Sequence, residues 1–227
     1  MNKDSRCLGL IGGLGPFATS HYYLGLVRSI EAAGRIPRLL VAHADVDTGR
    51  GFVERKDLDG LAAYLAGFAT QTKAGGAELT AFVAITPHIA AREFIARSPL
   101  PLIDMVSEVA DDVRRRGLKR IAMLGTRFTI ESRMFGRLGD VEIATPRPDE
   151  IDFIHTAYLD MVAERHTPAQ IDGLRRIAHT LVERDGAECV LMAGTDLMME
   201  FNAKNIDFPA LDCAAVHIAA ITKRLVG

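Results

Sequence analysis

Short apolar runs alternate with longer amphipathic stretches along nearly the whole chain. Continuous apolar runs closed by glycine or proline are typical of buried parallel strands, and apolar residues spaced three to four apart are typical of helices. The predicted strands are Cys7–Ile11, Leu39–Ala44, Leu79–Ile85, Leu102–Ile103, Arg120–Leu124, Glu142–Ala144, Cys189–Ala193 and a last one near Pro209–Leu211. The predicted helices are Thr19–Ala33, Leu58–Ala74, Pro87–Arg97, Val106–Arg116, Ile130–Leu138, Asp149–Glu164, Pro168–Asp185 and Ala214–Leu225. This alternation predicts an α/β fold with parallel sheets and helices on both faces.

The second half of the chain repeats the first. Three pairs of matched stretches occur in the same order: Leu10–Gly13 with Met123–Thr126, residues 76–78 with 186–188, and Pro101–Asp104 with Pro209–Asp212. We therefore predict two pseudo-symmetric domains, one of residues 1–105 plus 207–227 and the other of residues 106–206. Ligands bind beyond the carboxyl ends of the strands in such folds, so a cleft between the domains is the predicted site.

Composition narrows the function classes. The net charge of −2 over 227 residues gives no electrostatic case for nucleic acid or an anionic membrane. No apolar stretch reaches the ~20 residues of a membrane span, and the polar start is unlike a signal peptide, so we expect a cytoplasmic protein. Cys7, Cys189 and Cys213 are scattered and odd in number, which predicts neither a disulfide framework nor a metal site.

The glycine-rich segment Gly13–Ala18 has two interpretations. It matches a loose dinucleotide-binding fingerprint, which also expects an acidic residue at the end of the next strand. Glu31 lies in a predicted helix and Asp45 comes too late for that role. We prefer a tight turn that exposes backbone N–H groups at a helix start, where a carboxylate can dock, with Pro16 at the first helical position. No cofactor is expected.

Seven stretches form an ordered set: Leu10–Pro16, Gly76–Glu78, Thr86 with His88, Leu124–Thr129, Gly186–Glu188, Gly194–Asp196 and Asp212–His217. Together they resemble the aspartate/glutamate racemase family, a cofactor-independent superfamily that also contains hydantoin racemases, maleate isomerases and arylmalonate decarboxylases. The resemblance implies two flavodoxin-like, doubly wound domains with the active site between them. It also implies two cysteines that work as a thiol/thiolate pair on the α-proton of an amino acid. Paired subunits are common in this family, so a homodimer is compatible with it.

The resemblance breaks down at both cysteine positions. The family motif Cys-Asn-Thr-x-His falls on Ala84–His88, and the motif Gly-Cys-Thr-Glu falls on Ala193–Asp196. Ala84 and Gly194 therefore stand where the thiols are expected. Because a methyl group and a hydrogen cannot exchange protons, we do not expect ordinary two-cysteine racemisation.

What the resemblance leaves is a shell for a carboxylate. The positions expected to contact substrate are Leu14, Arg50, Thr86, Thr126, Thr129 and Thr195. Hydroxyl and backbone N–H groups suit carboxylate oxygens, and a guanidinium binds a distal carboxylate in a bidentate manner. Each threonine has an alternative role as a helix cap or strand end, and Arg50 as an exposed loop residue.

Two ionisable side chains are candidates for the lost proton chemistry. Asp196 follows the vacated Gly194 by two residues and is the remaining candidate base, and His88 follows Thr86 by two and is the candidate acid. Each also has a structural interpretation, Asp196 as a helix cap and His88 as a hydrogen-bonded helix residue.

Two functions of different class follow. In the first, the protein is an enzyme of the isomerase or lyase kind that acts on a small carboxylate or amino acid without cofactor and without cysteines. In the second, it is a non-catalytic metabolite-binding protein on a racemase scaffold. Deuterium uptake by a substrate separates the first from the second, which predicts ligand stabilisation without turnover.

Overall fold

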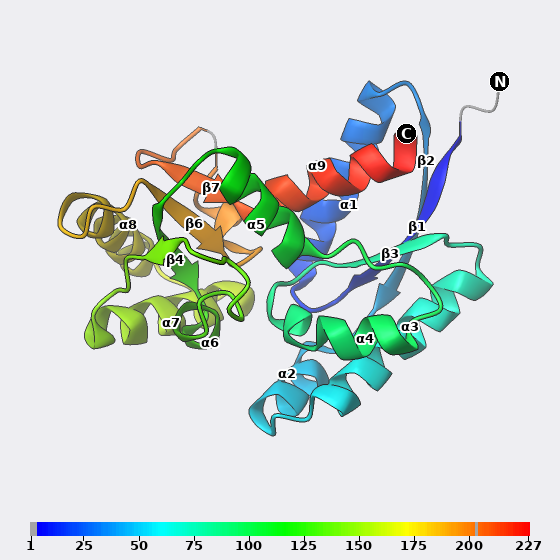
Figure 1. Cartoon of the computed structure of the whole chain (residues 1–227), viewed down its shortest axis with the longest axis horizontal. Helices are drawn as coiled ribbons and strands as arrows, with labels where there is room; N and C mark the ends of the chain where they lie inside the picture. Colours follow the sequence, from blue (N-terminus) through cyan, green and yellow to red (C-terminus); the bar gives the residue numbers. More distant parts are fainter. Residues whose placement is uncertain (1–3, 203) are drawn as a thin grey trace. The chain divides into compact units, whose positions relative to one another are not determined.

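The computed structural model describes residues 4–202 and 204–227. The chain divides into two compact units. The first unit comprises the chain up to Met105 and again from His217 to Gly227, and the second comprises Val106–Val216. Figure 1 shows the helices and strands of both units.

The first unit is built on a three-stranded parallel sheet. Strand β1 (Asp4–Gly12) lies between β2 (Ile36–His43) and β3 (Leu79–Phe82). The predicted strand at Leu102–Ile103 is reduced to a single parallel bridge between Thr80 and Leu102. The carboxyl ends of these parallel strands meet at one edge of the sheet, where the predicted glycine turn and the segment after β3 begin.

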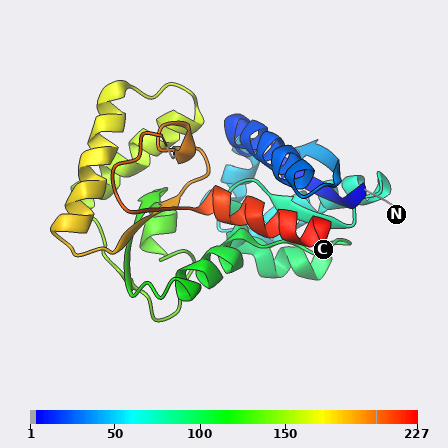
Figure 2. The ribbon, with the colours of Figure 1, turned by 90° about the horizontal axis from the view of Figure 1, so that it is seen from above.

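Helices cover both faces of this sheet. They are α1 (Pro16–Ala32), α2 (Val46–Glu54), α3 (Leu58–Ala74), the 3₁₀ turn η1 (Thr86–Ala90), α4 (Ala91–Arg97) and the last turns of α9 (Cys213–Val226). In Figures 1 and 2, α1 and the C-terminal part of α9 run side by side. Hydrogen bonds of Ser29 with Thr222 and of Arg35 with the Val226 carbonyl join them. Helix α2 was not predicted, because two glycines interrupt its apolar pattern.

The second unit contains a four-stranded parallel sheet with the order β5-β4-β6-β7. Its strands are β4 (Arg120–Gly125), β5 (Glu142–Ile143), β6 (Cys189–Ala193) and β7 (Ala210–Asp212). Because β7 pairs with β6, this unit extends to Val216, beyond the expected boundary at residue 207. A short strand is assigned to the sheet whose backbone groups it pairs with, which the sequence pattern does not reveal.

The helices of the second unit are α5 (Met105–Arg115, from Val106 onward), α6 (Arg127–Glu131), α7 (Pro148–Val162), α8 (Pro168–Glu183), the 3₁₀ turn η2 (Leu197–Met199) and the first turn of α9. The predicted helix Ile130–Leu138 is wrong beyond Glu131, where α6 ends. Arg133, Met134 and Phe135 have φ values of 50°, 56° and 61°, followed by Gly136 at 69°. Four consecutive residues therefore form a left-handed turn, which no apolar periodicity signals.

The duplication appears in matched hydrogen bonds. Glu78 accepts the N–H of Cys7 within β1 at 3.0 Å, and Glu188 accepts the N–H of Lys119, just before β4, at 2.6 Å. These backbone donors, with Arg6 beside Glu78, hold the pKa of both carboxyls below their ordinary values. The repeated Gly-Ala-Glu triplets thus place the same anchoring carboxylate in both sheets.

Candidate functional site

The glycine turn after β1 is held by a threonine of α1. Gly13 has φ of +83°, and a Cβ there would lie 2.9 Å from the backbone nitrogen of Ala44. The Gly13 N–H donates to Thr19 Oγ1 at 2.9 Å, and that hydroxyl donates to the Gly15 carbonyl at 2.9 Å. One N–H predicted to receive a carboxylate is thus already bound. Leu14, the predicted substrate contact, is only 7% exposed and packs in the core cluster.

Asp45 directly precedes helix α2, and Arg50, a predicted substrate contact, lies within that helix. Asp45 caps it by accepting the Thr48 N–H at 2.7 Å and the Thr48 hydroxyl at 2.6 Å, and these bonds lower the pKa of Asp45. Arg50 donates to Asp47 at 2.6 Å and lies 3.7 Å from Glu54, and its side chain is 53% exposed. The geometry favours a helix cap for Asp45 and the surface interpretation for Arg50.

The segment after β3 contains Ala84, Thr86 and His88. His88 is buried, its Nδ1 lies 2.9 Å from the Ala84 carbonyl, and its Nε2 accepts the Met105 N–H at 3.2 Å. These partners fix a neutral tautomer with the proton on Nδ1. The arrangement favours the structural interpretation of His88 over that of an acid. Thr86 is half-buried, and no residue of the described chain hydrogen-bonds to its hydroxyl.

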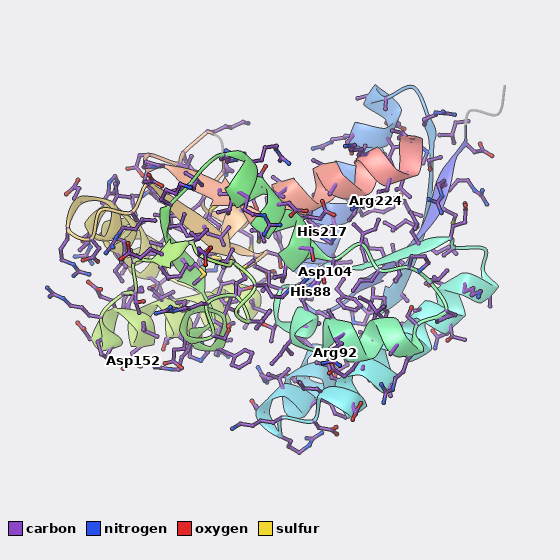
Figure 3. The ribbon with its side chains drawn as sticks, in the orientation of Figure 1. His88, Arg92, Asp104, Asp152, His217 and Arg224 are labelled. Carbon is purple, nitrogen blue, oxygen red and sulfur yellow. The ribbon has the colours of Figure 1, made fainter. Side chains whose placement is uncertain are left out.

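A second buried histidine lies near His88. His217 Nε2 donates to the Ile103 carbonyl at 2.9 Å, and the Tyr22 hydroxyl bonds to Nδ1 at 3.1 Å. Its ring centroid is 6.2 Å from that of His88. Figure 3 shows both histidines beside Asp104. Burial, and then the nearby His88, lower the pKa of His217 to about 3, so the ring is neutral at physiological pH. Its role is structural, because it connects Tyr22 and Ile103 by hydrogen bonds.

Thr126 and Thr129 form one hydroxyl pair at the end of β4. Thr126 caps α6 by accepting the Thr129 N–H at 3.1 Å, and the two hydroxyls are 2.9 Å apart. Gly125 precedes them, and a Cβ there would lie 3.0 Å from the Ala193 carbonyl carbon. The glycine therefore lets the ends of β4 and β6 approach closely. The structure brings both predicted threonines together, in a geometry that also serves as a helix cap.

The space beside Gly194 is filled by a side chain that sequence reasoning missed. A Cβ at this position would lie 2.6 Å from Tyr158 Cζ and 2.9 Å from its hydroxyl oxygen, and closer still to Cε2. Tyr158 belongs to α7 and is 8% exposed. The Tyr158 hydroxyl donates to Asp196 Oδ2 at 3.4 Å, and the Thr195 hydroxyl donates to the same oxygen at 3.4 Å. Thr195 and Asp196 are each 1% exposed.

Burial and charge keep the Tyr158 phenol protonated. Desolvation, then the nearby Asp196 carboxylate and Cys213, raise the pKa of Tyr158 well above its ordinary value. Its hydroxyl is accordingly a hydrogen-bond donor at neutral pH and not a base.

The three cysteines are buried, and Cys213 is the one that lies near Gly194 and Tyr158. Desolvation raises the pKa of Cys189 to about 11 and that of Cys213 well above its ordinary value, so both remain thiols. Cys213 begins α9, and the backbone N–H of Gly194 is among the groups that interact with its sulfur. Within residues 4–202 and 204–227, no group of three or more His, Cys, Asp or Glu is placed to hold a metal ion.

A family profile described as Asp/Glu/hydantoin racemase matches residues 11–221. The chain belongs to this racemase family. The matched residues belong to both units. They include all seven stretches that resemble the family, apart from Leu10 at the start of the first stretch.

Solved structures of racemase-like proteins have the same fold. A candidate Asp/Glu racemase from Yersinia pestis is 24% identical, with a TM-score of 0.84 over 98% of this chain and 100% of that chain. An aspartate racemase homologue from Pyrococcus horikoshii is 22% identical, with a TM-score of 0.79 over 96% and 98% of the two chains. An aspartate racemase from Picrophilus torridus is 18% identical, with a TM-score of 0.74 over 96% and 94%.

Within this racemase fold, the predicted residues fall into two groups. The first group lies at the strand ends of the second unit, where Thr126 contacts Thr129 and Thr195 contacts Asp196. The second group lies in the first unit, where Leu14 is part of the core and Arg50 is on the surface. Tyr158 was missed although its place in the helical apolar spacing marks it as buried. No helix in the described part of the chain has the length and apolar character of a membrane span.

Proposed function

We propose that this racemase-family protein binds a small carboxylate or amino acid at the carboxyl ends of its strands and acts on it as a cofactor-independent isomerase or lyase that uses no thiol pair. One observation carries the proposal. Beyond the end of β6, two residues after the position where the family motif has a cysteine, lies the buried carboxylate of Asp196. The hydroxyls of Thr195 and Tyr158 orient it.

The chemistry assigned to Asp196 is proton transfer to and from carbon. The carboxylate takes the proton of an activated C–H bond, the electron pair moves onto the substrate's carboxyl group, and the proton returns to carbon to complete the cycle. General base help of this kind is worth roughly 10²–10⁴ in rate. Because a carboxylate is a weak base, the substrate must be an activated acid whose developing charge is stabilised by hydroxyl groups at the strand ends of the same unit, such as those of Thr126 and Thr129.

A second function is supported by the burial of the same group. Asp196 is 1% exposed, and its partners Thr195 and Tyr158 are also buried. A carboxylate locked in this way also suits a fixed binding shell without turnover. The alternative is therefore a non-catalytic protein that binds an acidic metabolite.

Proton exchange in D₂O tests the proposal. D- and L-aspartate, D- and L-glutamate and malonate are incubated with the protein, and loss of the α-hydrogen signal is followed by ¹H NMR. Thermal stabilisation by each compound is measured in parallel. The variant Asp196→Asn is compared with Asp172→Asn, which removes an exposed carboxylate from α8. Because all three cysteines are buried, the thiol-free variant Cys7→Ala/Cys189→Ala/Cys213→Ala serves as a second control.

Exchange that persists in the thiol-free variant and in Asp172→Asn but is lost in Asp196→Asn supports the isomerase or lyase function. Stabilisation with no exchange supports the binding function instead. Exchange that is lost in a folded thiol-free variant, or the absence of both exchange and stabilisation with every compound, overturns the proposal.

A further inference from the structure

Helix α7 directs one aromatic ring at the end of β6. Its buried residues are Ile151, Ile154, Ala157, Tyr158 and Met161, which form one helical face. Packing of this face fixes the Tyr158 ring, and the ring occupies the volume that any side chain at position 194 would need. Gly194 is therefore required by Tyr158, and the absence of a side chain there does not leave an open space.

The Tyr158 hydroxyl and the Thr195 hydroxyl both donate to Oδ2 of Asp196, each at 3.4 Å. Two donors from different elements, a helix and a strand end, restrict the rotation of the carboxylate. The candidate base is thus oriented partly by a residue 38 positions away in the sequence.

We infer that Tyr158 is a positioning residue of the site: its ring fills the side-chain space at Gly194, and its hydroxyl holds the Asp196 carboxylate in place. The inference rests on the proposed function for its catalytic meaning, because it is Asp196 that would meet substrate. The geometric part stands on the contacts alone.

The protonation state of Tyr158 restricts the chemistry that this strand end can perform. The phenol keeps its proton, so it cannot remove a proton from carbon as a thiolate would. Asp196 is then the acceptor of protons at this strand end, with Tyr158 as its donor partner. A cysteine introduced at position 194 would collide with the ring before it could act.

The matched variant is Tyr158→Phe, which retains the ring and removes only the hydroxyl. A double-mutant cycle with Asp196→Asn measures the coupling by urea unfolding. We expect the two changes to be non-additive by about two- to tenfold in the unfolding equilibrium constant, the range of one hydrogen bond. Tyr158→Phe combined with Asp172→Asn is the control pair, and its effects should be additive. Additive effects of Tyr158→Phe and Asp196→Asn as well would overturn the inference.

A spectroscopic measurement tests the state of the phenol itself. The four tyrosines are labelled with ¹³C at Cζ, and the Tyr158 signal is identified by its loss in Tyr158→Phe. We expect this signal to keep its protonated position through the range near pH 10 in which free tyrosine titrates, up to the pH at which circular dichroism shows unfolding. Titration of Tyr158 like free tyrosine in the folded protein overturns the inference.

Neither measurement uses a ligand, so their failure is distinguishable from failure of the proposed function. Where deuterium exchange is found, a third readout separates positioning from mere stability. In Tyr158→Phe the acidic limb of the pH–rate profile moves to higher pH, because a carboxylate that loses a donor holds its proton more tightly. An unshifted profile with an intact fold contradicts the positioning role.

Discussion

Replacing Gly194 by alanine should destabilise the protein strongly because of one aromatic ring. The added Cβ would lie 2.6 Å from Tyr158 Cζ, whereas carbon atoms pack at about 3.5–4.0 Å. Overpacking of a core costs about 1–3 kcal/mol, and displacing the ring also breaks its long hydrogen bond to Asp196, at about 0.5–1.5 kcal/mol. We therefore expect the free energy of unfolding to fall by roughly 3 kcal/mol. For a chain of this size the melting temperature then drops by roughly 6–12 °C.

Urea and thermal unfolding of four proteins measure this effect: wild type, Gly194→Ala, Tyr158→Ala and the double variant. Tyr158→Ala alone should cost about 3–5 kcal/mol through the cavity it leaves. In that background the methyl group at residue 194 meets no ring and fills part of the cavity. The coupling energy should therefore be about 2 kcal/mol or more, with the double variant more stable than the sum predicts.

Gly173→Ala is the matched control. A Cβ at Gly173 would lie 2.5 Å from Phe153 Cε1, which is nominally as tight, but Phe153 is 36% exposed and its ring can rotate into solvent. In the interior of α8 alanine gains about 0.5–1 kcal/mol over glycine. We expect this variant to be neutral or more stable. The explanation is wrong if Gly194→Ala has the same melting temperature as the wild type. It is also wrong if Gly194→Ala destabilises the Tyr158→Ala background as much as it destabilises the wild type.

Three further outcomes are expected. The pKa of His217 is about 3 in the folded protein and about 6.5 in the unfolded chain, so between these pH values the unfolded state binds more protons. The free energy of unfolding should therefore fall as the pH is lowered from 6.5 to about 3, by up to about 1.4 kcal/mol per pH unit. Urea unfolding at several pH values should show a weaker pH dependence in His217→Asn than in the wild type. Arg133→Gly should raise stability by about 1 kcal/mol in thermal unfolding, since the native φ of 50° suits glycine; an unchanged or lower melting temperature contradicts this. Ala84→Cys/Gly194→Cys should give no aspartate racemisation by circular dichroism of the amino acid, because Tyr158 occupies the space of the second thiol; measurable racemisation by this double variant would show that the ring yields.

Much of the fold followed from local pattern. Apolar runs and glycine punctuation predicted the central strands β1, β4 and β6, since a strand buried on both faces has to be continuously apolar. The matched triplets at residues 76–78 and 186–188 predicted the duplication, and each places a glutamate against its central strand. The left-handed turn at residues 133–136 escaped prediction because its φ values depend on packing that no local sequence rule describes.

For the candidate site, the motifs predicted which residues are present and the tertiary structure decided their contacts. The motif sequence was enough to indicate that Ala84 and Gly194 bring no proton carrier and that Asp196 stands beside the second position. Only the tertiary structure decided that His88 is tied to Met105 and that Arg50 pairs on the helix surface. It also decided that Tyr158 fills the space at Gly194. The sequence determines which groups are available, because side-chain chemistry is local, whereas their partners depend on which distant elements pack together.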